Sequence, residues 1–245
     1  MKLSKSVRTF GSLKCRVIQS DTLDEANSGL VILNHGFGAS GEDLVDIGAM
    51  LMSESANIAA KFRFVFPEAP IDLGPMGMPG GRAWWPINMA QLAEINQTQD
   101  YSELTRISPP GMPAATLLLA AALQEMRTNY NAVEESIVLG GFSQGAMIST
   151  HLMLSTGFKP ALLALFSGTL LWRDEWTRMA AAHPHCSVLQ SHGFEDPILP
   201  FGAATELSKM LTDAGFDVDF VQFHGGHTIP INVMQKLSER LELIR

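Results

Sequence analysis

The chain has 245 residues, a formal net charge of −8, and 46% apolar against 17% charged residues. This composition suits one large globular domain with an ample core and excludes a disordered chain. The acidic balance argues against nucleic acid or an anionic membrane as a main partner, because phosphate binding needs clustered lysines and arginines. No run of 18 apolar residues is present, so no segment is expected to span a bilayer.

The ends and the cysteines give a first indication of the compartment. Residues 1–8 lack the apolar core of a signal peptide, and Cys15 and Cys186 fit no redox or ligand spacing. A reduced, cytoplasmic protein is therefore predicted. His183 and His185 lie beside Cys186, but no further ligand follows at metal-site spacing, and we expect no metal.

The first quarter of the chain predicts strands at one side of a sheet. Residues 7–18 alternate weakly and are expected to form one or two antiparallel edge strands. Residues 29–34 are a continuous apolar run, as expected of a central strand covered on both faces. A helix over 42–53 and a strand over 62–66 follow, and the strand is closed by Pro67.

The least regular stretch is 67–113, which holds eight of the thirteen prolines. Such density breaks long elements, and a long irregular excursion inside a compact domain is usually functional. Met76, Met78, Trp84 and Trp85 are predicted to line an apolar substrate pocket, because methionines and flat aromatic rings adapt to such ligands. The alternative is a surface flap whose aromatic side chains pack down. Exposed apolar residues in this excursion also offer a contact for a homodimer.

The remainder alternates strands with helices, which predicts one α/β domain over residues 1–245 with a doubly wound, mostly parallel sheet and helices on both faces. Parallel strands end at one edge of a sheet, so the polar loops that follow them should meet there. The expected strands are 136–139, 161–166, 186–191 and 217–223. The expected helices are 90–106, 114–128, 147–154, 202–214 and 231–243, and 172–183 is a short helical or loop region.

The segment around Ser143 has the layout of a nucleophile elbow, in which a strand, a tight turn and a helix follow one another. Gly141 and Gly145 flank the serine, as the close approach of strand end and helix start requires. The turn should lift the Ser143 hydroxyl above the sheet. The first free N–H groups of the helix, above all that of Gln144, would then favour a developing oxyanion. A glycine-rich turn that only packs is the alternative.

A second small-residue loop, 35–41, follows the central strand. In hydrolases of this plan such a loop supplies the second oxyanion N–H, and Phe37 is the expected donor. His35 is expected to hold the loop by hydrogen bonds and not to act as a base.

The serine needs a base and an acid from other strand ends. His227 is preferred over His224, because the glycine pair before it gives the loop freedom to turn the imidazole toward the serine. His224 is expected to be packed at its strand end. Asp196 is preferred over Glu195 as the acid that orients the base, since Glu195 is expected to point to solvent. The chain order serine, aspartate, histidine is that of α/β-hydrolases.

Four segments together resemble the carboxylesterase/lysophospholipase family that includes acyl-protein thioesterases. They are residues 35–38, 141–146, 192–197 and the pair 226–227. The phenylalanine before the serine and the glutamine after it are more specific than the glycine pattern alone. The similarity covers roughly residues 28 to 243.

The resemblance implies the α/β-hydrolase fold, a triad of Ser143, His227 and Asp196, oxyanion donors at Phe37 and Gln144, and a site that needs no cofactor. It implies a serine hydrolase that cleaves carboxylic esters through an acyl-enzyme. A lysophospholipase or acyl-protein thioesterase with long-chain preference stays open, because the excursion is longer than the family's usual one. A non-catalytic binding protein of the same fold is the alternative from another class.

Overall fold

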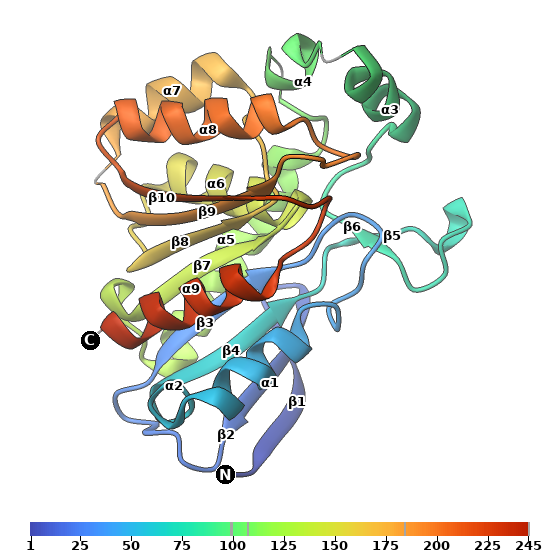
Figure 1. Cartoon of the computed structure of the whole chain (residues 1–245). Coiled ribbons are helices and arrows are strands. Elements are labelled where there is room, and N and C mark those ends of the chain that lie inside the picture. The colour runs from blue at the N-terminus through green and yellow to red at the C-terminus, as the bar shows by residue number, and fades with distance from the viewer. Residues whose placement is uncertain (99, 107, 184, 245) are drawn as a thin grey trace.

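In the computed structural model, which describes residues 1–98, 100–106, 108–183 and 185–244, eight strands of the described chain form one sheet (Figure 1). Their order across the sheet is β1-β2-β4-β3-β7-β8-β9-β10. The hairpin β1–β2 is antiparallel and pairs antiparallel to β4, and every pairing from β4 to β10 is parallel. The strands are β1 Leu3–Phe10, β2 Leu13–Ser20, β3 Gly29–Asn34, β4 Phe62–Pro67, β7 Ile137–Phe142, β8 Leu162–Phe166, β9 Ser187–Gly193 and β10 Asp217–Phe223.

The central strands read as unbroken apolar runs because both of their faces are covered. In β3, Leu30 and Ile32 pack into one core, and Val31 and Leu33 pack into the other. The two cores correspond to two helical layers, visible on opposite faces of the sheet in Figure 1. One layer holds α1 Val45–Glu54, α2 Ala56–Lys61 and α9 Ile231–Leu243; the other holds α5 Met112–Tyr130, α6 Gln144–Thr156, α7 Arg173–Ala182 and α8 Phe201–Asp213. This arrangement confirms the predicted doubly wound α/β fold.

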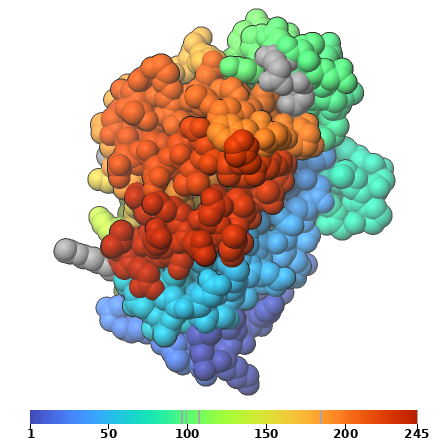
Figure 2. Space-filling model, in the orientation of Figure 1, coloured from blue at the N-terminus to red at the C-terminus, as the bar shows by residue number. Residues whose placement is uncertain are grey.

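The excursion leaves the sheet after β4 and forms two parts. The first is an arm around the short strands β5 (Ile71–Asp72) and β6 (Arg82–Ala83), with the 3₁₀ turn Gly74–Met76 at its tip. It projects from the body as the cyan segment of Figures 1 and 2. The second part is a pair of helices, α3 (Met89–Thr98) and α4 (Ser102–Arg106).

The single helix predicted over 90–106 is therefore two helices. The Asp100 carboxylate accepts a hydrogen bond from the Ser102 N–H at 3.1 Å, which starts a new helix there. Positions 99 and 107, which belong to the predicted excursion, lie outside the described residues, as do 184 and 245.

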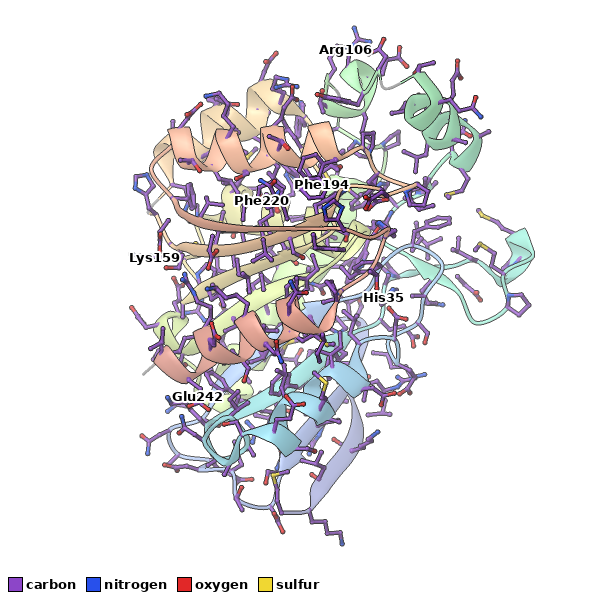
Figure 3. The ribbon with its side chains drawn as sticks, viewed as in Figure 1. His35, Arg106, Lys159, Phe194, Phe220 and Glu242 are labelled. Carbon is purple, nitrogen blue, oxygen red and sulfur yellow. The ribbon has the colours of Figure 1, made fainter. Side chains whose placement is uncertain are left out.

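His35 and Phe194 lie toward the end of the sheet from which the arm projects, whereas Lys159 and Glu242 lie toward the opposite end (Figure 3).

Among the described helices, none is both long and apolar enough to cross a membrane. Cys15 and Cys186 are free and buried, and burial raises the pKa of each thiol to about 12.

Candidate active site

Ser143 sits in the turn between β7 and α6, in a backbone conformation that few residues other than glycine adopt. Its φ is 55° and its ψ is −118°. The turn is held by a hydrogen bond from the Ser143 N–H to the Phe166 carbonyl, at 2.8 Å. Strain of this kind persists only where the surroundings enforce it, and it is typical of functional sites.

The glycines on either side of the serine are required by contact with β3. A Cβ on Gly145 would lie 1.8 Å from the Asn34 carbonyl oxygen, and a Cβ on Gly141 would lie 2.2 Å from the same atom. Neither distance is possible for a real side chain. The elbow therefore packs directly on the end of β3, which brings the loop after β3 against the serine.

His227 and Asp196 meet on the loops that follow β10 and β9. The His227 Nδ1 atom lies 2.7 Å from Asp196 Oδ2. Because an ionised carboxylate can only accept, Nδ1 carries the proton and donates it, and Nε2 is left to act as an acceptor. The His227 side chain is 15% exposed and the Asp196 side chain is fully buried.

Four donors surround the Asp196 carboxylate. Oδ1 accepts the N–H groups of Ile198 and Leu199 at 2.8 and 2.9 Å. Oδ2 accepts from His227 and lies 3.2 Å from His192 Nε2. Burial alone would raise the pKa of Asp196, but the hydrogen bonds from His192 and His227 outweigh it and hold that pKa well below its usual range. The Asp196 carboxylate is therefore ionised at neutral pH.

The two rivals of this pair form a pair of their own at the surface. His224 Nδ1 lies 3.1 Å from Glu195 Oε1, and the two side chains are 87% and 59% exposed. Glu195 is exposed as expected. The expectation that His224 is packed was wrong, because its ring leaves the sheet edge and meets Glu195 in solvent.

Ser143 and His227 line one cavity of about 300 Å³. The ring of Phe142, the neighbour of the serine, lies 4.7 Å from the His227 ring, centroid to centroid. Among the hydrogen bonds of the described residues, none joins the Ser143 hydroxyl to His227. Such contacts are often loose in a free enzyme and shorten when substrate binds. Asp43 is the second ionisable residue of the wall, and loss of water raises its pKa.

Two backbone N–H groups are available beside the serine. Those of Phe37 and Gln144 have no acceptor among the described residues. Phe37 belongs to the wall of the catalytic cavity, and Gln144 begins α6, whose positive dipole end points at the same place. The structure thus brings both predicted donors to the serine's side of the sheet edge.

His35 is a buried neutral histidine that braces the loop after β3. Its Nδ1 lies 2.7 Å from the Gly36 carbonyl, and its Nε2 accepts the N–H of Ala69 at 3.0 Å. One nitrogen donates and the other accepts, so a second proton has no place, and burial lowers the pKa of His35 to about 4. The structural role expected of His35 agrees with these contacts.

The chain matches the family model described as Phospholipase/Carboxylesterase over residues 13–245. It belongs to this family. The phospholipase/carboxylesterase family consists of ester hydrolases, so the chain is a carboxylesterase-type hydrolase, and the expected family and fold are confirmed.

Relatives of this family member are distant. The chain is 28% identical over 221 residues to a Kluyveromyces lactis protein named acyl-protein thioesterase 1, covering 86% of this chain and 90% of that protein. It is 29% identical over 195 residues to the Candida albicans protein of the same name, covering 76% and 78%. Its fold is that of esterase PE8, with a TM-score of 0.73, 24% identity and full coverage of both chains. A Bacillus cereus carboxylesterase matches with a TM-score of 0.67, 18% identity and 95% of each chain.

The four residues predicted to line the pocket of this esterase occupy different places. Trp85 lines a second, mainly apolar cavity of about 140 Å³. Trp84 is 1% exposed and lines neither this cavity nor the catalytic one. Met76 and Met78 are 66% and 42% exposed on the arm. The arm carries them outward, and only Met78 approaches the site, where its methyl group covers Gly38.

Other residues build the cavity instead. The two cavities share Ile87, Leu92, Met147 and Leu199 in their walls, so they are neighbours, and the second cavity lies beneath α3. The second cavity is further bounded by Ile95, Leu104, Pro109 and Pro110. Apolar residues such as Ile95 and Leu104 are ordinary on helices, so the sequence carried no signal that they line a cavity.

Two polar side chains at the site escaped the sequence reasoning. His192, fully buried, shares its Nε2 proton between Asp196 and the Leu199 carbonyl, which lies 3.0 Å away. The Gln144 side chain is also fully buried and bonds to the backbone of Trp84 and Trp85. The position of His192 at a strand end, four residues before the acid, was the signal that could have indicated its role.

Proposed function

We propose that this esterase hydrolyses carboxylic esters through a Ser143–His227–Asp196 triad and an acyl-enzyme. The observation that carries the proposal is the 2.7 Å contact between His227 and the buried Asp196, at a cavity that also holds the strained serine. An aspartate that fixes the tautomer of a histidine beside an elbow serine is the arrangement that activates an alcohol as a nucleophile.

In the first half of the reaction, the Ser143 hydroxyl attacks the ester carbonyl and its proton passes to His227 Nε2. Asp196 stays ionised and stabilises the imidazolium that forms. The carbonyl oxygen becomes an oxyanion beside the free N–H groups of Phe37 and Gln144. His227 then gives the proton to the leaving alcohol or thiol, and the acyl group remains on the serine.

In the second half, water takes the place of the leaving group. His227 removes a proton from the water, the resulting hydroxide attacks the acyl carbon, and the same two N–H groups stabilise the second oxyanion. Return of the proton to Ser143 releases the acid. All proton transfers use one imidazole, so no cofactor is needed in this scheme.

The proposal is tested with p-nitrophenyl butyrate and a fluorophosphonate probe. We expect Ser143→Ala to lower kcat by about 10⁴- to 10⁶-fold and to abolish labelling. Ser155→Ala, an exposed serine farther along α6, is the matched control and should match the wild type. Equal rates for wild type and Ser143→Ala would reject the assignment. An active-site serine that stays unlabelled in folded wild-type protein would instead favour the non-catalytic binding protein.

We infer further that long acyl chains are preferred, because an apolar cavity beside Trp85 and Leu104 adjoins the cavity of Ser143 and shares four wall residues with it. Each buried methylene is worth about 0.8 kcal/mol, or roughly fourfold in kcat/KM. A series of p-nitrophenyl esters from acetate to decanoate should rise by about this factor per carbon until the space is filled. A flat or falling series would favour a small-ester hydrolase. Matched decanoyl oxygen esters and thioesters separate esterase from thioesterase activity.

A further inference from the structure

Trp84 lies between the two loops that carry the oxyanion N–H groups and is bonded to both. Its indole Nε1 donates to the His35 carbonyl at 3.0 Å, two residues before Phe37. Its backbone N–H donates to Gln144 Oε1 at 2.8 Å. Gln144 Nε2 in turn donates to the Trp85 carbonyl at 2.9 Å. One residue of the excursion thus links the loop after β3 to the first residue of α6.

A second connection fixes the position of this link. Beside Trp84, the backbone of Arg82 exchanges two hydrogen bonds with the loop after β3: Gly38 N–H donates to Arg82 at 2.9 Å, and Arg82 N–H donates to Ala39 at 2.8 Å. Arg82, two residues before Trp84, is therefore held against the loop by backbone hydrogen bonds. Phe37 precedes the two bonded residues, Gly38 and Ala39.

All the groups in this link are buried. Trp84, Gln144 and His35 are 1%, 0% and 2% exposed. Buried hydrogen bonds keep their geometry, because breaking one leaves a donor or acceptor with no water to replace the partner. An oxyanion hole needs its donors about 2.7–3.1 Å from the developing oxyanion, so the separation of the two donor loops matters for the rate.

We propose that Trp84 and the side chain of Gln144 are positioning residues of the oxyanion hole, holding the Phe37 and Gln144 N–H groups at the separation that the tetrahedral intermediate needs. The inference rests on the proposed acyl-enzyme mechanism and adds a role that a merely packed tryptophan lacks. It gives the excursion a part in the chemistry besides enclosing a cavity. Neither side chain contacts the substrate; both act through the backbone that they hold.

The experiment compares a ligand that forms an oxyanion with one that does not. On 1,1,1-trifluoro-2-octanone, Ser143 Oγ bonds to the ketone carbon, its proton passes to His227, and the carbonyl oxygen becomes the oxyanion. The parent 2-octanone has the same chain and stays a ketone. The inhibition constants of both, with kcat and KM for p-nitrophenyl butyrate, are measured in wild type, Trp84→Phe and Gln144→Met.

Trp84→Phe removes the indole N–H and keeps an aromatic ring, and Gln144→Met removes both side-chain bonds at nearly constant volume. We expect each to lower kcat and the affinity for the trifluoroketone by about 10- to 100-fold, with KM and the affinity for 2-octanone within about threefold of wild type. Replacement of Trp84 by benzothienylalanine, which has the shape of tryptophan but no N–H, should give the same split and avoids any loss of packing.

The matched control is Trp176→Phe. Trp176 is also buried and donates its indole N–H to His151 at 3.2 Å, away from the serine. It should lower the melting temperature and leave the ratio of the two inhibition constants unchanged. Folded Trp84 variants with wild-type affinity for the trifluoroketone would overturn the inference and leave the triad intact. A wild-type protein that neither hydrolyses the ester nor adds the trifluoroketone would refute the proposed function itself.

Discussion

The triad loops and the excursion meet at Ser143, but they are built in different ways. The proposed serine, acid and base lie in the loops that follow β7, β9 and β10 of the same sheet, and three of the four donors around Asp196 come from within four residues of it. The excursion has two two-residue strands and two short helices, and it encloses a cavity with residues as far apart as Trp85 and Pro109. The proposed catalytic groups are thus placed by the ends of strands, whereas the proposed substrate space depends on how a long segment packs.

The largest effect should come from the acid of the triad. Asp196→Asn replaces one carboxylate oxygen by an N–H₂ group, which cannot accept the His227 Nδ1 proton. The imidazole would then carry its proton on Nε2 and could not accept one from Ser143. We expect kcat to fall by about 10⁴-fold near neutral pH, as measured with p-nitrophenyl butyrate.

The surface pair provides the control. Glu195→Gln removes the exposed carboxylate that contacts His224 and should change kcat less than twofold. A larger loss of kcat in Glu195→Gln than in Asp196→Asn would identify Glu195 as the acid. The buried carboxylate of Asp196 would then have only a structural role, contrary to the comparison above.

The second prediction concerns stability in acid. His35 is neutral and buried, with a pKa of about 4 in place of about 6.5. A histidine whose pKa is depressed on folding stabilises the protein above pH 6.5 and loses that contribution as the pH falls toward 4, because the unfolded chain binds the proton more readily. The unfolding free energy of both proteins should fall when the pH is lowered from 7 to 4.5. In His35→Gln this fall should be smaller than in wild type by about 2.5 kcal/mol.

Urea unfolding at the two pH values measures this difference. His151 is also buried with its pKa lowered to about 4, and it contributes a loss of its own. The pH dependence of the unfolding free energy should therefore be reduced in His35→Gln and not abolished. His224→Gln, at an exposed histidine, is the control. An unchanged pH dependence of the unfolding free energy in His35→Gln would show that His35 accepts a proton in the folded protein without loss of stability.

The difference between the strand-end loops and the excursion also explains which parts of the fold and the site could be predicted from the sequence. The apolar runs of β3, β4 and β8, and the order of serine, acid and base, carry their signal within a few residues. The helix α2 was missed because it is only six residues long, Ala56–Lys61, and has no apolar periodicity. Trp84 and Trp85 are adjacent and alike in sequence, yet one links two loops and the other lines a cavity. Only the tertiary path of the chain separates these roles.

The third prediction tests the substrate space. Leu104→Trp adds bulk to the second cavity, beneath α3, where Leu104 is part of the wall. The kcat/KM for p-nitrophenyl decanoate should fall about 10-fold relative to wild type, and that for the acetate should stay within twofold. Leu117→Trp, at a 72% exposed leucine of α5, is the control. Equal losses for both esters would show that α4 shapes the catalytic end and not the chain-length limit.

The smallest effect comes from the strain stored at the elbow. With φ at 55°, Ser143 carries a Cβ where glycine would carry none, a cost of roughly 1–3 kcal/mol. Alanine keeps that Cβ, so Ser143→Gly should have a higher unfolding free energy than Ser143→Ala, as measured by urea unfolding. The expected difference is about 1 kcal/mol, once the greater freedom of glycine in the unfolded chain is subtracted. The half-buried Ser208 within α8 is the control, where glycine should be less stable than alanine by about 1 kcal/mol. If alanine were more stable than glycine at both positions, the backbone at Ser143 would hold no strain and would be no more constrained than that of an ordinary helix.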